Sequence, residues 1–192
     1  HGQIPSSIGN LTNLIELKLY YNQLSGEIPT GIGNMADLTH LYLRGNQLTG
    51  GIPPEIWNLV NLDRLYLEHN QLTGEIPPEI GNLVNLRYIN LKDNQLSGEI
   101  PESIGNLTNI IGFSLSNNQL SGVIPYSICN FAQDNPYVWV YGNQLCPPYP
   151  DCLSDEQING SWQTSGGEDD QQDTSECEEP SLCDEGYTEI DE

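Results

Sequence analysis

Side chains that could bind a ligand recur in this chain at a fixed spacing. Aromatic and charged residues stand two, four or six positions before an asparagine that returns every 24 residues. Tyrosine, tryptophan and arginine are enriched at the energetic centres of protein interfaces, and exposed aromatic rings can also stack on sugars. The pattern predicts a ligand-binding face for a protein or a carbohydrate. Its candidate residues are Lys18, Tyr20, His40, Tyr42, Arg44, Arg64, Tyr66, Glu68, Tyr88, Lys92, Trp139 and Tyr141.

The sequence gives little support for catalysis. It contains no Gly-x-Ser-x-Gly elbow, no phosphate-binding glycine loop and no His-Glu-x-x-His motif. His40 and His69 lie one repeat apart and could form a metal or acid–base site with Glu68 and Asp93. The simpler interpretation is that they are surface histidines at a variable repeat position. We therefore expect a non-enzymatic protein with no cofactor and no bound metal.

The repeat itself predicts how these side chains are held. Leu17 and Leu19 are two positions apart, which is the spacing of residues on one side of a strand, so Lys18 points to the other side. One repeat cannot bury such an apolar edge alone, and stacked neighbours close a continuous core around a parallel sheet. We expect the recurring asparagines to form a buried ladder that satisfies backbone groups of neighbouring turns. They are Asn22, Asn46, Asn70, Asn94 and Asn118, with an altered sixth copy at Asn143.

The second half of each repeat resembles a known family. It has the form Leu-Ser/Thr-Gly-x-Ile-Pro, as at residues 24–29, and is followed by Ile-Gly-Asn-Leu. This pattern closely resembles the plant-specific class of leucine-rich repeats, which occurs in receptor-kinase ectodomains and polygalacturonase inhibitors and in some bacterial and algal surface proteins. The resemblance implies an α/β solenoid. It would be a right-handed superhelix with a parallel concave β-sheet, a second small sheet and short convex helical turns, closed by a cysteine-containing C-terminal cap.

The sequence divides into three regions. Residues 1–145 form the solenoid with an incomplete first repeat, residues 146–153 the C-terminal cap, and residues 154–192 an acidic tail that is expected to be flexible. All five cysteines lie towards the C-terminal end, at Cys129, Cys146, Cys152, Cys177 and Cys183. We expect disulfides that close the open end of the solenoid, with reduced or metal-bound thiols as the alternative. The connectivity does not follow from sequence.

Composition restricts the partners. The formal net charge is −22, and residues 146–192 hold 15 acidic residues and no lysine or arginine. This excludes a nucleic-acid-binding protein, which needs a basic footprint, and it disfavours an anionic membrane surface. No apolar run approaches the length of a membrane span, so direct membrane insertion is not expected. Disulfides would place the protein outside the cytosol, in the extracellular space or at the cell surface.

Two functions remain open. The first is an extracellular recognition module that binds a protein or glycan on the concave face. The alternative is a structural, self-associating repeat element of a cell-surface coat, adhesin or filament. Residues 2–5 match the Gly-x-Ile-Pro part of a repeat, so the chain begins inside one. We expect Ile4, Ile8 and Leu11 to lack a preceding turn that covers them, which predicts end-on contact through residues 1–20.

Overall fold

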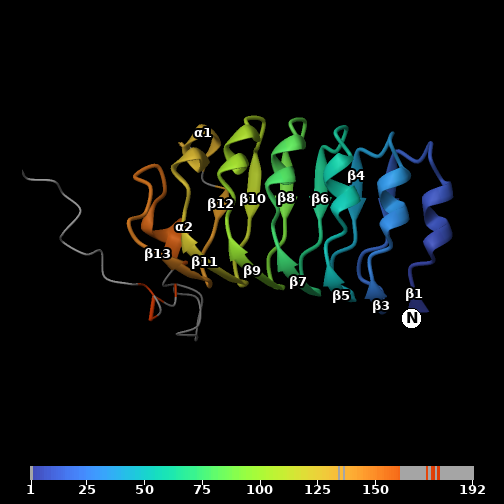
Figure 1. Ribbon diagram of the computed structural model, residues 1–192, viewed down its shortest axis with the longest axis horizontal. Helices are drawn as coiled ribbons and strands as arrows, with labels where there is room; N and C mark the ends of the chain where they lie inside the picture. The colour runs from blue at the N-terminus through green and yellow to red at the C-terminus, as the bar shows by residue number, and fades with distance from the viewer. Residues whose placement is uncertain are drawn as a thin grey trace, which may run out of the picture.

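The repeats lie side by side in one array, which runs from the N-terminal end to the C-terminal cap (Figure 1). The computed structural model describes residues 2–133, 135, 137–160, 172, 174, 175 and 177. Successive repeats add strands to two parallel sheets, and short 3-10 helices lie in the connecting segments. The α/β solenoid predicted from the sequence is confirmed, with its parallel concave sheet and short convex helical turns. None of the helices in the described part of the chain is long and apolar enough to cross a bilayer.

One sheet carries the columns that were predicted to bind a ligand. Its central residues, such as Leu41 and Leu65, pair in register and point into the core, so the residues on either side of them point outward. We call this outward surface the concave face. Within the described residues the sheet has six strands: β2 (Glu16–Lys18), β4 (His40–Tyr42), β6 (Arg64–Tyr66), β8 (Tyr88–Asn90), β10 (Gly112–Ser114) and β12 (Val138–Trp139).

The second sheet is larger than expected. The resemblance predicted a small sheet, but this one has seven strands within the described residues, because even the partial first repeat contributes a strand. A column of serine and threonine residues lies in it, at Ser25, Thr49, Thr73, Ser97 and Ser121. The strands are β1 (Gly2–Gln3), β3 (Leu24–Glu27), β5 (Gln47–Gly51), β7 (Gln71–Glu75), β9 (Gln95–Glu99), β11 (Gln119–Val123) and β13 (Gln144–Cys146).

Each 3-10 helix directly follows the proline that ends the Gly-x-Ile-Pro segment. The proline ring fixes its own φ, so the residue before the helix is held in an extended conformation. Successive turns approach closely, and a Cβ at Gly81 would lie 2.7 Å from the carbonyl oxygen of Ser103. The equivalent position in η3 carries Trp57, which is fully buried in the core. The helices are η1 (Ser6–Asn10), η2 (Thr30–Asn34), η3 (Pro54–Asn58), η4 (Pro78–Asn82), η5 (Glu102–Asn106) and η6 (Tyr126–Ile128).

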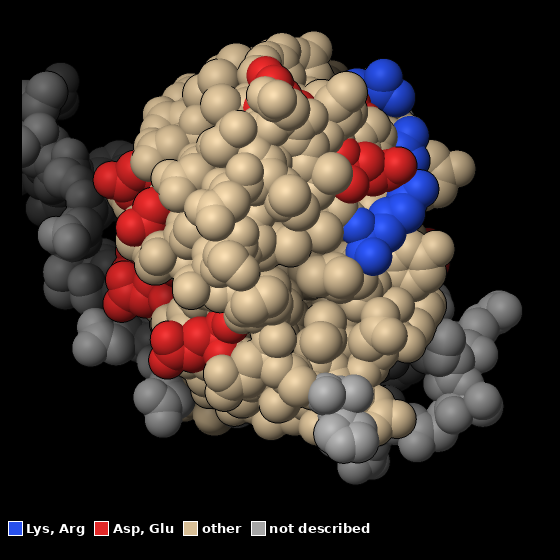
Figure 2. All heavy atoms as spheres, turned by 90° about the vertical axis from the view of Figure 1, so that its right-hand side faces the viewer, with Lys and Arg blue, Asp and Glu red and all other residues tan. Residues whose placement is uncertain are grey.

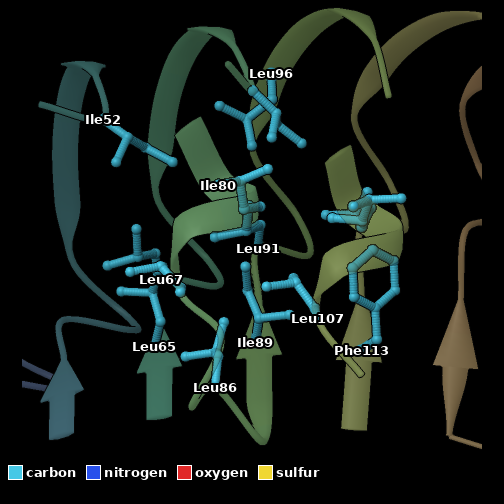
Figure 3. Close-up of a cluster of buried hydrophobic side chains, with 14 of the residues drawn as sticks. Ile52, Leu65, Leu67, Ile80, Leu86, Ile89, Leu91, Leu96, Leu107 and Phe113 are labelled. Carbon is cyan, nitrogen blue, oxygen red and sulfur yellow. The ribbon is translucent and has the colours of Figure 1, made fainter. Parts of the chain in front are cut away.

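The core is one continuous column of stacked aliphatic side chains. Leu65, Ile89 and Phe113 project inward from neighbouring strands β6, β8 and β10, and Ile80 and Leu107 pack with them (Figure 3). Burying one such side chain contributes about 1.5–3 kcal/mol. Because each repeat repeats the same contacts, the core holds the sheet rigid along its length.

The asparagine ladder is present, but its first member differs from the prediction. Asn46, Asn70, Asn94 and Asn118 are buried, and each donates to a carbonyl of its own turn and to one in the preceding repeat. Asn22 was expected to be buried and is instead exposed. Among the described residues its amide donates within its own turn, to the carbonyls of Leu19 and Tyr20, because β2 is the first strand of the six-stranded sheet there.

The N-terminal edge is only partly open. Ile4 was expected to lack cover, but it is 5% exposed and belongs to the core, because the repeat that follows packs against it. Ile8 is half-buried against the same core. Leu11 is 50% exposed and Ile15 is 61% exposed. End-on association through residues 1–20 therefore stays a prediction, with a smaller apolar edge than the sequence indicated.

Disulfides close the C-terminal end, as predicted. Cys129 bonds to Cys152 and Cys146 bonds to Cys177, while the remaining candidate, Cys183, lies outside the described residues. Two short helices belong to this region, α1 (Cys129–Ala132) and α2 (Asp155–Asn159). Ile158 of α2 joins the core. We therefore propose that the cap extends past residue 153, at which the sequence analysis ended it.

A glutamine ends the asparagine ladder. The side chain of Gln172 accepts hydrogen bonds from the backbone N–H groups of Asn143 and Leu145 and donates to the carbonyl of Val140. In the regular repeats the next asparagine makes the equivalent bonds, as Asn118 does with the repeat before it. Gln172 thus supplies the last rung from a segment that has no repeat pattern.

Candidate functional site

All twelve residues predicted to bind a ligand lie on the six-stranded sheet or in the turn directly after one of its strands. Strand alternation places them on the concave face, and the parallel register stacks equivalent residues in columns. Most are half-buried, Lys18 and Tyr20 are exposed, and Glu68 is buried. The predicted set therefore shares one face, but it does not form a single site.

The N-terminal half of this face is a packed row of tyrosines. The ring centroids of Tyr20 and Tyr42 are 6.3 Å apart, and those of Tyr42 and Tyr66 are 5.2 Å apart, both with edge-to-face geometry. The guanidinium carbon of Arg44 lies 5.2 Å from the ring centroid of Tyr20 and 5.8 Å from that of Tyr66. Edge-to-face ring pairs and cation–π contacts each add attraction beyond area burial. The row is thus fixed before any ligand arrives.

Basic side chains gather on this face of an otherwise acidic protein. Viewed from the N-terminal end, lysine and arginine side chains lie along one side, and acidic side chains form a row on the opposite side (Figure 2). All five lysines and arginines lie in or next to strands of the six-stranded sheet. Asp63 pairs with two of them, with oxygens 3.2 Å from Nε of Arg64 and 3.2 Å from Nε of Arg87. Asp63 and Arg87 organise the face and were missing from the predicted set.

The two histidines do not converge on one site. Nε2 of His40 lies 3.6 Å from a carboxylate oxygen of Asp63, whereas Nδ1 of His69 lies 2.8 Å from Asp93. Asp93 also accepts a hydrogen bond of 2.7 Å from the Asn117 amide. In the part of the chain that the structure describes, no three His, Cys, Asp or Glu side chains are grouped to hold a metal ion.

A hollow of about 260 Å³ opens in the C-terminal half of the concave face. Large rings stand on both sides of it, Tyr66 and Tyr88 from β6 and β8 and Tyr137 and Trp139 from the last repeat. Between them the outward positions are small. The residues that line the hollow are Arg44, Tyr66, Glu68, Tyr88, Ile89, Asn90, Gly112, Phe113, Ser114, Tyr137 and Trp139.

Gly112 keeps the hollow open. It occupies the column that holds Arg64 in β6 and Tyr88 in β8, and a Cβ placed on it would lie 3.0 Å from the Tyr88 ring. Ser114, in the next outward column, is likewise small, and its hydroxyl bonds to that of Ser116 at 2.9 Å. The hollow therefore results from two short residues in β10, which stand between aromatic neighbours.

Glu68 is the unusual charge in this hollow. Its side chain is only 7% exposed, and Oε1 lies 3.4 Å from Nη1 of Arg44. Its other oxygen, Oε2, is buried without a hydrogen-bond partner among the described residues, and so is Nε of Arg44. Burial raises the pKa of Glu68 above its ordinary value of 4.5, although a backbone hydrogen bond and Arg44 act in the opposite direction. The carboxylate is thus costly to keep ionised in the folded protein.

We predict that Glu68→Gln stabilises the fold at neutral pH. Because the folded protein binds the Glu68 proton more tightly than the unfolded chain does, stability falls as pH rises from the unfolded pKa through the raised folded one. Glutamine removes that cost, so its benefit should be largest at about pH 7 and small below about pH 4. Thermal melts followed by circular dichroism at both pH values test this. Glu16→Gln, an exposed acid of the same face, is the control. A lower midpoint for Glu68→Gln at pH 7 would contradict the prediction.

The sequence found part of the hollow and missed the rest. Arg44, Tyr66, Glu68, Tyr88 and Trp139 were predicted and line it. The prediction missed four residues that line the hollow from outward positions: Asn90, Gly112, Ser114 and Tyr137. The sequence did carry a signal for the hollow. In β10 both outward columns have a small residue, Gly112 in one and Ser114 in the other. The remaining predicted residues lie outside the hollow: Lys18, Tyr20, His40, Tyr42, Arg64, Lys92 and Tyr141.

Family models match most of the repeat region. A model described as Leucine Rich repeats (2 copies) matches residues 36–79 and 60–104, and a Leucine Rich Repeat model matches residues 13–35 and 109–131. No curated protein matches the chain significantly. The matched segments cover both the tyrosine row and the hollow up to β10.

Solved structures resemble the chain closely. The plant peptide hormone receptor RGFR1, solved with RGF2, is 40% identical, with a TM-score of 0.72 over 75% of this chain and 23% of that one. A chain of the BIR3–SERK2 complex from Arabidopsis thaliana is 38% identical, with a TM-score of 0.62 over 72% of this chain and 73% of that one. A plant ice-binding protein is 38% identical, with a TM-score of 0.67 over 75% of this chain and 46% of that one. The chain thus spans less than a quarter of the receptor.

Proposed function

The chain belongs to the leucine-rich repeat family, in its plant-receptor type, and from this we propose that it is an extracellular module that recognises a peptide on its concave face. The observation that carries the proposal is the hollow between Tyr66, Tyr88 and Trp139, next to the fixed row of tyrosines. Rigid aromatic anchors next to a concave site lose little conformational entropy on binding. The aromatic anchors can therefore bind without reorganising.

A peptide suits this surface better than a large globular partner. The hollow has the volume of a few side-chain groups, and the sheet around it is a shallow track along which an extended chain can lie. The likeness to a receptor solved with its peptide hormone supports the same ligand class. A glycan, which could also stack on the tyrosine row, is the competing ligand.

An extracellular location is supported by the chemistry of the cap. Two disulfides join four of the five cysteines. Such bonds persist in oxidising compartments and are rare in the cytosol. The likeness to receptor structures agrees with this.

The likeness to a plant ice-binding protein raises a competing function, for which the second sheet is the candidate surface. Its serine and threonine column could match a regular lattice. Glu27, Glu75 and Glu99 lie exposed in the same strands, however, and place carboxylates along that surface. Because charged groups hold their own hydration water, a lattice match is less favourable there than a peptide contact on the concave face.

We predict that Arg64→Ala combined with Tyr66→Ala weakens peptide binding at least thirtyfold. Tyr66 forms one wall of the hollow, and Arg64 lies 4.8 Å from the ring of Tyr88. Truncating a hot-spot residue typically costs about 2 kcal/mol or more, which is about thirtyfold in affinity. A random peptide library displayed on phage can be selected against the wild-type chain. The dissociation constants of the enriched peptides are then compared by fluorescence anisotropy.

The matched control is Glu79→Ala, which changes an exposed residue of η4 on the convex side and should leave affinity unchanged. Peptides that lose binding to the control and keep it to the double variant would place the site on the wrong face. If no peptide is enriched and sedimentation shows concentration-dependent assembly, the structural, self-associating function is favoured instead. A sugar array run with the same variants tests the glycan.

A further inference from the structure

Two polar groups at the hollow lack partners. Oε2 of Glu68 and Nε of Arg44 are both buried, and neither makes a hydrogen bond among the described residues. The two side chains belong to neighbouring repeats, both line the hollow, and they meet through Nη1 and Oε1 at 3.4 Å. A buried polar group without a partner destabilises the folded protein, so a partner from a ligand recovers that cost. Because both atoms lie below the surface of the hollow, a small turn of the two side chains towards it would offer a ligand one acceptor and one donor.

The charges at the hollow restrict what can supply both partners. Arg44 and Glu68 neutralise each other, so the site as a whole has no net charge to attract an ion. An ammonium or guanidinium group from a ligand would meet the positive charge of Arg44, and a carboxylate would meet Glu68. A neutral group that both donates and accepts avoids both conflicts. A side-chain carboxamide has this combination, with an NH2 donor and a carbonyl acceptor.

We propose that the hollow is a specificity subsite for an asparagine or glutamine side chain of the peptide ligand. In this arrangement the amide NH2 donates to Oε2 of Glu68 and the amide oxygen accepts from Nε of Arg44. The rings of Tyr66 and Trp139 enclose the apolar part of the side chain, and Gly112 leaves the space for it. The proposal rests on the peptide-binding function proposed above and adds the identity of one recognised residue.

The proposed subsite discriminates between peptide side chains because a side chain without the carboxamide leaves Oε2 of Glu68 and Nε of Arg44 unpaired. A site that is built to hydrogen-bond a polar group rejects an analogue without that group strongly, because its own buried groups then stay unsatisfied. Leucine has the branched shape of asparagine but can neither donate nor accept a hydrogen bond. Glutamate has the shape of glutamine but brings a second carboxylate to Glu68. Both should bind worse than the amide, for different reasons.

Four peptide libraries test the proposal. They are identical except that their central residue is fixed as Gln, Glu, Lys or Leu, and each is selected against the wild-type protein. The Gln library should give the tightest binders. Within such a binder, Gln→Glu should weaken affinity at least tenfold. In the Glu68→Gln protein the same exchange should cost at least tenfold less, because the repelling carboxylate is gone.

Glu16→Gln is the matched control, since it removes an exposed acid of the same face that does not line the hollow. This variant should keep the full penalty for Gln→Glu. If the Lys or Leu library gives the tightest binders and these still depend on Arg64 and Tyr66, the carboxamide subsite is wrong while the peptide-binding function stands. If no library gives binders that depend on those two residues, both proposals fail. Melting curves of each variant verify that it is folded.

Discussion

Loss of both disulfides is expected to destabilise the protein by about 3 kcal/mol or more for each bridge. Cys129 and Cys152 are 23 residues apart, and Cys146 and Cys177 are 31 apart. In the chain-entropy account, closing loops of these lengths removes about 3–4 kcal/mol of conformational freedom from the unfolded chain. Replacing all four cysteines with serine should therefore lower the urea midpoint sharply. Urea unfolding followed by circular dichroism measures the change.

The two bridges are expected to differ, and paired substitutions separate them. Cys146–Cys177 also holds the segment that brings Gln172 to the last rung of the ladder, so its loss should cost more than that of Cys129–Cys152. Cys183→Ser, which takes part in neither bridge, is the control and should have no effect. Equal stability of the wild type and the four-serine protein would show that packing alone holds the cap.

The repeat region could be predicted in detail because its structure is local in sequence. Leu41 and Leu65 occupy equivalent positions, and one repeat determines where both point. The same logic placed the concave columns correctly, since a parallel register stacks equivalent residues. Burial of the asparagines followed from their position at the end of a strand. These features need only the neighbouring repeat to form.

Features at the two ends of the array could not be predicted from the repeat pattern. Asn22 is followed by the same residues as Asn94, yet it is exposed because β2 is the edge strand of the six-stranded sheet among the described residues. Gln172 makes ladder bonds from a segment that has no repeat pattern, so no periodicity identifies it. The pairing of the cysteines likewise depends on how the cap folds back.

Aligning the repeats also did not predict which residues of the concave face are buried and where the face is hollowed. Tyr66 and Glu68 stand in adjacent outward columns and look equally available in the sequence. In the structure Glu68 is buried beside Arg44, and the hollow next to it exists because Gly112 and Ser114 are small. Columns predict which face a residue lies on. Whether a residue stands beside the hollow or is buried beneath it depends on the size of the side chains one and two repeats away.

Asn94→Ala is expected to cost about 3 kcal/mol of unfolding free energy, as much as a core leucine truncation. The Asn94 amide donates to the carbonyls of Leu67, Leu91 and Lys92 at 3.1, 3.0 and 3.2 Å. Its oxygen accepts from the backbone N–H of Leu72 at 3.0 Å. Alanine leaves that buried N–H and two buried carbonyls without these bonds in the middle of the array. Urea unfolding measures the cost, and Asn94→Asp, which keeps the size but buries a carboxylate against the three carbonyls, should cost at least as much.

Asn22→Ala makes the same chemical change at the first rung and should cost less than about 1 kcal/mol. Asn22 is exposed, and its amide donates only to Leu19 and Tyr20, whose carbonyls can bond to water when the amide is removed. The difference between Asn94→Ala and Asn22→Ala therefore isolates the bonds that join one repeat to the next. If the two substitutions cost the same, each asparagine serves only its own turn, and stacking of the leucines alone couples the repeats.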